Sequence, residues 1–168
     1  MLALPWLALC AGYDLRSRTL PAWLSIPPLL LAILWAGLQG AWAVSILAVT
    51  LLFLDDLPWR MRGFLGGLQG LLLLFAWQQA GWNGVGLGAT LMLIWLFWKL
   101  GAFGGADAQV LMTLALFFQP AILLPIAVAG GIQGLIQRLR GKTDLPALLA
   151  ILAGAGVYIL GACLHNIF

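Results

Sequence analysis

The chain has 168 residues, of which 64% are hydrophobic and only 8% are charged. Soluble globular domains carry about 25% charged residues, so this composition excludes an ordinary soluble enzyme. It also excludes a disordered chain, because disorder needs low hydrophobicity and high net charge. The net charge of +3 comes from scattered Lys and Arg residues rather than one basic stripe, which argues against nucleic-acid binding. The remaining class is an integral membrane protein, and its long unbroken apolar runs favour helices over the alternating strands of a barrel.

Charged residues divide the chain into apolar intervals. They fall in four groups, Asp14 to Arg18, Asp55 to Arg62, Lys99 to Asp107 and Arg138 to Asp144. Each interval between them is too long for one span of about 20 residues and suits two spans joined by a tight turn. Turn-forming residues lie inside each interval, at Gly37 to Gly40, Gln78 to Gly86 and Gln119 to Pro120.

This division predicts an all-α polytopic membrane protein with about eight transmembrane helices in one domain, residues 1–168. Six spans are the alternative, if a short pair of helices is only re-entrant. The expected spans are 1–18, 22–38, 41–57, 64–80, 84–101, 105–119, 121–137 and 146–164. The stretch from Met1 to Gly12 lacks a positively charged start, so we expect part of the first span rather than a cleaved signal peptide.

With eight crossings, every Lys and Arg falls on one side of the membrane. The positive-inside rule makes that side cytoplasmic. All five aspartates fall there too, whereas His165, the only histidine, falls outside. We therefore expect a multi-pass protein of the cytoplasmic membrane whose chemistry faces the cytoplasm and does not use a Ser/His/Asp arrangement. Cys10 and Cys163 lack CxxC spacing, so we interpret them as packing residues and expect no metal site.

Three aspartates have ordinary explanations. Asp55 and Asp56 precede Pro58 in a charged loop, and Asp144, two residues before Pro146, is typical of a helix start. Asp14 differs, because it lies within the first span if that span has at least 17 residues. A carboxylate near the membrane boundary is costly and is by default a functional candidate. The alternative, an ion pair with Arg18 one helical turn later, stays open.

Asp107 opens a predicted span directly after Gly104, Gly105 and Ala106. These small residues allow close approach of another helix or of an extended peptide. The positive end of the helix dipole also favours an ionised carboxylate there. A simple capping role is the alternative, but it does not explain three small residues, so we favour a functional role.

Two aspartates at one membrane depth suggest a shared site. Close carboxylates do not easily ionise together, so one keeps a proton while the other acts as a base. Such a pair can activate water for peptide hydrolysis, because the base takes the water proton and the acid polarises the carbonyl. Proton translocation is the main competing role for two acids in a membrane.

At these aspartates the chain resembles the type IV prepilin peptidases and preflagellin peptidases, the GxGD-type intramembrane aspartic proteases. The first motif runs from Asp14 to Ser25, with Leu20-Pro21-Ala22 at the family's Ile-Pro-Asn position. The second is Gly104-Gly105-Ala106-Asp107, similar to the Gly-Gly-Ala-Asp variant of archaeal-type members, with Gln109 where Lys is common. The resemblance covers mainly residues 10–30 and 99–120.

The resemblance implies a peptidase-only aspartic endopeptidase, without a methyltransferase or zinc-binding domain, that cleaves short basic leaders from pilin-like precursors. It implies Asp14 and Asp107 as the catalytic pair and no metal or cofactor. The residues implied to bind substrate or shape the site are Gly104, Gly105, Ala106, Arg16, Arg18, Pro21 and Gln109. An inactive homologue and a small proton-coupled transporter are the alternatives. The sequence does not indicate an oligomeric state.

Overall fold

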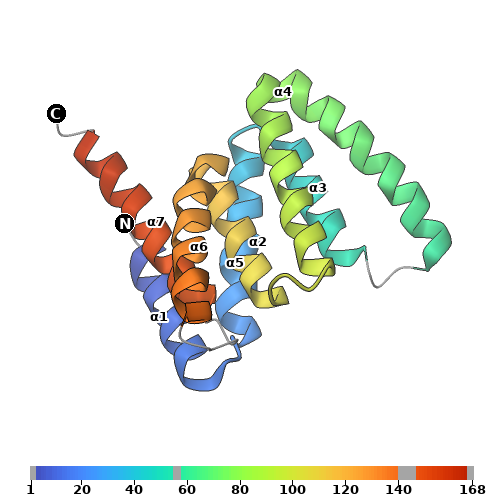
Figure 1. Ribbon diagram of the computed structural model, residues 1–168. Helices are drawn as coiled ribbons and strands as arrows, with labels where there is room; N and C mark the ends of the chain where they lie inside the picture. Colours follow the sequence, from blue (N-terminus) through green and yellow to red (C-terminus); the bar gives the residue numbers. More distant parts are fainter. Residues whose placement is uncertain (1–2, 55–57, 140–146, 166–168) are drawn as a thin grey trace. The chain divides into compact units, whose positions relative to one another are not determined.

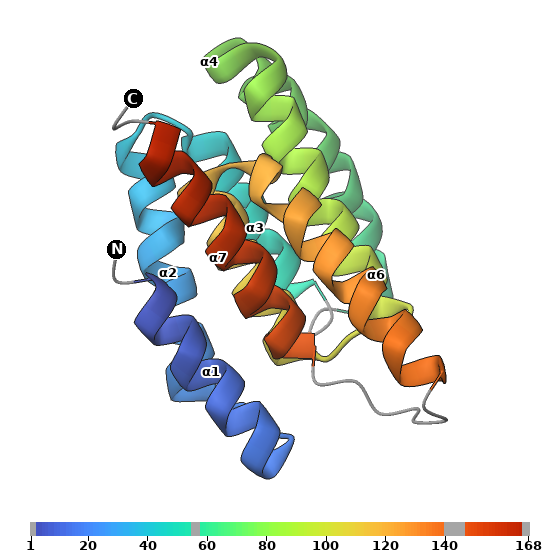
Figure 2. The same ribbon diagram turned by 60° about the vertical axis from the view of Figure 1, so that its left-hand side comes forward.

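The computed structural model describes residues 3–54, 58–139 and 147–165, and all regular structure in these ranges is helical (Figures 1 and 2). Seven α-helices and one short 3-10 helix follow one another in these ranges. They are α1 (Ala3–Ser17), α2 (Ala22–Leu38), α3 (Trp42–Phe53), α4 (Trp59–Lys99), α5 (Gly105–Phe118), η1 (Pro120–Ile122), α6 (Leu123–Leu139) and α7 (Ala147–His165). The predicted all-α class is confirmed.

The chain forms two compact units. The first combines Met1–Ser25 with Ala121–Phe168 and so contains α1, α6 and α7. The second, Ile26–Pro120, contains most of α2 together with α3, α4 and α5. The N-terminal helix thus belongs with the two C-terminal helices.

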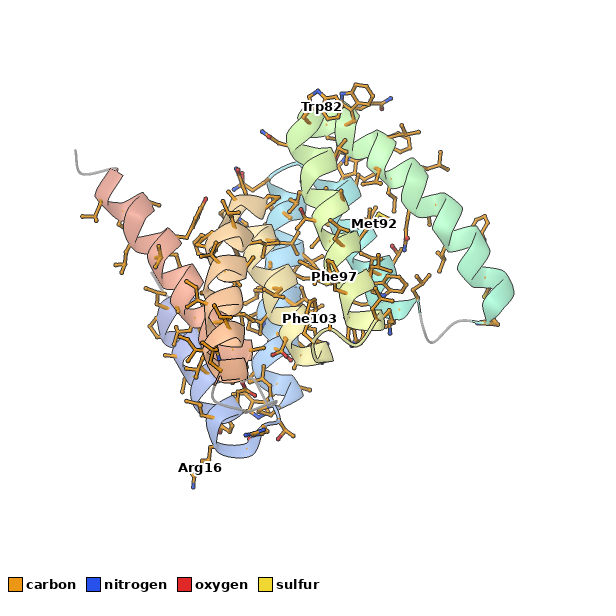
Figure 3. The ribbon with its side chains drawn as sticks, viewed as in Figure 1. Arg16, Trp82, Met92, Phe97 and Phe103 are labelled. Carbon is orange, nitrogen blue, oxygen red and sulfur yellow. The ribbon has the colours of Figure 1, made fainter. Side chains whose placement is uncertain are left out.

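In the second unit, α4 is a hairpin of two helical limbs. The helical backbone breaks at Ala80 and Gly81, where Gly81 has φ +57° and ψ −139°. Figure 1 shows the two limbs meeting at this bend, and Trp82 lies at the bend in Figure 3. The indole rings of Trp77 and Trp82 stack across it, with centroids 5.6 Å apart. The turn predicted within Gln78 to Gly86 is confirmed.

Two glycines one helical turn apart allow the limbs of α4 to pack closely. A Cβ atom at Gly84 would overlap with the carbonyl group of Ala76 in the opposite limb. A Cβ atom at Gly88 would lie 2.6 Å from a terminal methyl group of Leu73, so that side chain would have to move. Small residues spaced by four positions are the usual means by which membrane helices approach each other.

In the first unit, α6 and α7 lie side by side (Figure 2), and α7 also packs against α1. Gly154 of α7 is buried, and a Cβ atom there would overlap with the Ile126 backbone of α6. A Cβ atom at Gly130 would meet the methyl group of Ala150 at 3.8 Å, an ordinary contact. The α6–α7 pair therefore depends on a glycine at one crossing point.

The helix positions agree with the eight predicted segments when the two limbs of α4 are counted separately, but eight full crossings are not supported. Among the described residues, two helical stretches are long and apolar enough to cross a bilayer, Gly63–Lys99 and Ala147–Leu164. The other described helices are shorter than this length. Helix α3 has 12 residues, and a helix of that length spans about 18 Å, against about 30 Å of hydrocarbon. The expected span 41–57 was thus too long for the helix that forms there.

Candidate functional site

Asp14 lies on the inward face of α1. Leu7, Cys10 and Ala11 are buried, and their spacing defines one stripe along the helix. Asp14 is seven residues after Leu7 and extends this stripe by one turn toward the end of the helix. Arg16 is exposed on a different face and extends away from the chain (Figure 3). The carboxylate and the nearby cation thus face different surroundings.

One oxygen of the Asp14 carboxyl group is buried without a partner. Oδ2 accepts no hydrogen bond from any described residue. Burying a carboxylate oxygen without a donor costs several times the net stabilisation that an ordinary hydrogen bond provides. A buried polar atom without a partner among the described residues needs an explanation other than packing.

The alternative of an ion pair between Asp14 and Arg18 stays open, and the structure shows how the two residues lie at the end of α1. Helix α1 ends at Ser17, and Arg18 follows it in the left-handed region with φ +54°. The Arg18 N–H donates to the Asp14 carbonyl oxygen at 2.9 Å, which closes the helix end. Arg18 therefore lies one turn after Asp14, at the point where the chain leaves the helix.

The turn around Pro21 is held by contacts between α1 and the start of α2. The Trp6 indole N–H donates to the Leu24 carbonyl at 2.9 Å. Tyr13 and Trp23 pack edge to face, with ring centroids 6.1 Å apart. Pro21 accepts a bond from the Leu24 N–H at 2.9 Å and so takes part in starting α2. The first motif is therefore a structured helix–turn–helix connection, in which Pro21 has a structural role.

Asp107 is the third residue of α5, and its side chain caps the helix. Its Oδ2 atom accepts a hydrogen bond from the Gly104 N–H at 3.2 Å. Gly104 precedes the helix in an extended conformation, with ψ 159°. This is one half of a capping box, the acidic residue reaching back to the residue before the helix. The capping role left as an alternative for Asp107 is thus present.

Two of the small residues before Asp107 have packing reasons, contrary to our expectation. A Cβ atom at Gly105 would lie 3.2 Å from the Trp98 indole, and one at Gly104 would lie 3.3 Å from the Asp107 carboxylate. The ammonium group of Lys99 sits 3.8 Å from the centroid of the same Trp98 ring. Trp98 therefore packs against both sides of the bend between α4 and α5, a role that the sequence did not predict.

Two further predicted site residues lie on α5, and the other sequence predictions concern a cysteine and three aspartates. Ala106 and Gln109 are half-buried on α5, and the Gln109 carbonyl accepts a bond from the Thr113 hydroxyl at 2.7 Å. Cys10 is fully buried and unbridged, as a packing residue should be. Asp55, Asp56 and Asp144, expected in loops, lie outside the described residues.

Each candidate aspartate belongs to a different unit, Asp14 to the first and Asp107 to the second. The structure therefore describes their surroundings separately, and their convergence stays a prediction. Within the ranges that the structure covers, no cluster of three His, Cys, Asp or Glu residues could hold a metal ion.

No known protein family, curated protein or solved structure matches this chain. The prepilin peptidase resemblance rests on the residues of its two motifs.

Proposed function

We propose that the chain is a multi-pass membrane aspartic endopeptidase. It removes short basic leader peptides from type IV pilin-like precursors at the cytoplasmic face of the membrane, with Asp14 and Asp107 as the catalytic pair. The observation that carries this proposal is the buried, unpartnered Oδ2 atom of Asp14 on the inward stripe of α1. A buried carboxylate oxygen without a partner among the described residues is unfavourable for folding alone, so it favours a functional role.

Placement in a membrane is supported by the apolar surfaces of α6 and α7. Leu139 is 80% exposed and Val157 is 68% exposed, and their helices carry further exposed aliphatic residues. Soluble monomers rarely expose contiguous apolar patches of more than a few hundred Å². We infer that these faces contact lipid. We further propose that the chain crosses the membrane eight times, or six times if short helices such as α3 are re-entrant. This number rests on the match between the predicted segments and the helices.

We assign the roles of Asp107 and Asp14 in the proposed hydrolysis from the surroundings of each side chain. The Gly104 N–H and the N-terminus of α5 stabilise negative charge on Asp107, so we assign it the base that takes a proton from water. Asp14 then holds the proton of the pair and polarises the peptide carbonyl. Water oxygen bonds to the carbonyl carbon, the carbon–nitrogen bond breaks, and the leaving amine receives the Asp14 proton. No cofactor takes part in this sequence.

The glycine-rich bend before Asp107 suits an extended substrate. Gly104 lies exposed beside the carboxylate, so a peptide backbone can approach without meeting a side chain. We propose that Ala106 and Gln109 line this approach on α5. Arg16 faces away from Asp14 and is not assigned a catalytic contact. The proposed partner is a pilin-like precursor with an apolar helix and a Lys- or Arg-bearing leader.

The direct test is cleavage of a pilin-like precursor by the purified full chain in detergent or liposomes. The wild type should shorten the precursor, whereas Asp14→Asn and Asp107→Asn should each leave it intact. Asp55→Asn and Asp144→Asn serve as matched controls, because they remove the same charge elsewhere and should not abolish cleavage. Normal cleavage by Asp107→Asn would end the proposed mechanism.

The cap formed by Asp107 favours one second candidate, an inactive homologue that only binds pilin-like helices. In that case Asp107 serves only as a helix cap, through its 3.2 Å hydrogen bond from the Gly104 N–H. The precursor would then copurify with the wild type without being shortened. Asp107→Asn would leave this copurification unchanged, because its amide oxygen still accepts the capping bond.

A further inference from the structure

The bend of the α4 hairpin carries exposed tryptophans beside uncharged amides. Trp77 is 52% exposed and Trp82 is 78% exposed, and their stacked rings lie on either side of the break at Gly81 (Figures 1 and 3). The neighbouring side chains Gln78 and Asn83 are exposed as well. The bend therefore presents large rings together with uncharged polar groups.

The start of α3 adds a third tryptophan to the same end of the second unit. Trp42 packs against Phe75 of α4, with ring centroids 5.8 Å apart. The Ala43 N–H donates to the Gln79 side chain at 3.3 Å, which fixes the first turn of α3 beside the bend. The aromatic cluster at this end consists of Trp42, Phe75, Trp77 and Trp82.

The charged ends of the hairpin lie far from this cluster. The chain has no Asp, Glu, Lys or Arg between Gly63 and Trp98, whereas Arg62 precedes this stretch and Lys99 follows it. Each limb rises by about 25 Å between its charged end and the bend. The hydrocarbon core of a bilayer is about 30 Å thick, so the bend lies roughly one membrane thickness from both charged ends.

The kind of exposed side chain changes along each limb. After the charged end come exposed leucines, such as Leu74 at 57% and Leu93 at 52%, and then the aromatic rings and amides of the bend. The same order of layers is found across a bilayer, where Lys and Arg lie on the cytoplasmic side and Trp lies at the water interface. A protein partner would not require this order or this length.

We propose that the aromatic cluster anchors the α4 hairpin in the lipid headgroup layer of the non-cytoplasmic leaflet. The indole rings contact the upper acyl carbons, and the Trp82 N–H donates to lipid ester or phosphate oxygens. Tryptophan suits this layer because one end of its side chain is apolar and the other forms hydrogen bonds. The inference rests on the membrane placement in the proposed function, but it does not depend on the catalytic pair.

The test measures the depth of the bend in liposomes. In a Cys10→Ala, Cys163→Ser background of the full chain, Asn83→Cys and Leu74→Cys each carry a bimane fluorophore. The liposomes contain phosphatidylcholine with a spin-label quencher either on the headgroup or near the end of the acyl chain. The label at position 83 should be quenched more strongly by the headgroup probe. The label at position 74, about 9 Å from the break at Ala80, should be quenched more strongly by the chain-end probe.

Substitutions of the tryptophans test what holds the bend at this depth. Trp77→Leu with Trp82→Leu keeps apolar side chains but removes both indole N–H groups, so the label at position 83 should shift toward the chain-end quencher. Trp77→Tyr with Trp82→Tyr should keep the wild-type depth, because tyrosine shares the preference for the interface. The matched control is Trp23→Leu, an exposed tryptophan of the first unit, which should leave the depth unchanged.

Stronger quenching of the label at position 83 by the chain-end probe, or quenching by a water-soluble reagent alone, would overturn the proposal. An unchanged depth after both tryptophans become leucine would overturn it as well. So would a photo-cross-linker at position 83 that captures a second copy or another protein instead of lipid.

Failure here is distinguishable from failure of the proposed function. A wrong depth at position 83 with normal precursor cleavage refutes only the lipid anchor, whereas Asp107→Asn should abolish cleavage and leave that depth unchanged.

Discussion

Asp107 is expected to have two separable roles, as a helix cap and as a catalytic base. Asp107→Asn keeps a side-chain oxygen that can accept the Gly104 N–H but removes the acid–base function. Asp107→Ala removes both. Comparison of the two variants therefore distinguishes loss of chemistry from loss of structure at one position.

The structural cost should be small in both variants. The cap is a single hydrogen bond of 3.2 Å at an exposed site, and such a bond stabilises by about 0.5–1.5 kcal/mol. Loss of the negative charge at the helix N-terminus adds about 0.3–1 kcal/mol. We expect Asp107→Ala to lower the free energy of unfolding by about 1–2 kcal/mol and Asp107→Asn by less than 1 kcal/mol. Cleavage should fall by at least 10²–10⁴-fold, roughly the contribution of general acid–base catalysis, in both.

Thermal unfolding in detergent measures the first quantity, and the initial rate of precursor cleavage measures the second. We expect the two variants to differ in their free energy of unfolding but to lose precursor cleavage to the same extent. Normal cleavage by Asp107→Asn, with loss of activity only in Asp107→Ala, would refute the catalytic role, because the aspartate would then act as a cap alone.

Two further predictions concern helix packing, each with a neighbouring glycine as control. Gly84→Ala should destabilise by about 1–3 kcal/mol because its methyl group overlaps with the Ala76 carbonyl across the α4 hairpin. Gly86→Ala, which meets nothing within 4 Å, should be neutral or stabilising by up to about 1 kcal/mol. Gly154→Ala should likewise destabilise by separating α7 from the α6 backbone, whereas Gly156→Ala should not. Thermal unfolding checks both pairs, and equal effects within a pair would contradict the helix crossings described.

The helix pattern was largely predictable because charges and turn residues interrupt otherwise uniform apolar runs. The segment 22–38 coincides with α2, and the turn within Gln78 to Gly86 contains the break at Gly81. Span length was less predictable. Helix α3 ends at Phe53, and only Leu54 follows before Asp55 and Asp56, so the predicted segment 41–57 was too long because it included both aspartates.

The two aspartates could be selected from the sequence, but their surroundings could not. Where α1 ends is decided by the left-handed conformation at Arg18, which composition does not reveal. The glycines before Asp107 appeared to need a functional reason. The contact of Gly105 with Trp98 arises only when the chain bends back between α4 and α5.

The central claim, that Asp14 and Asp107 meet, is tested most directly by cross-linking cysteines at these two positions. In a Cys10→Ala, Cys163→Ser background, Asp14→Cys with Asp107→Cys should be joined by a short bifunctional thiol reagent in native membranes and detected by peptide mass spectrometry. The control pair, Asp14→Cys with Trp82→Cys, should not be joined, because the proposed topology puts Trp82 at the opposite membrane face. Absence of the first cross-link, although a maleimide labels both cysteines, would contradict a shared catalytic site.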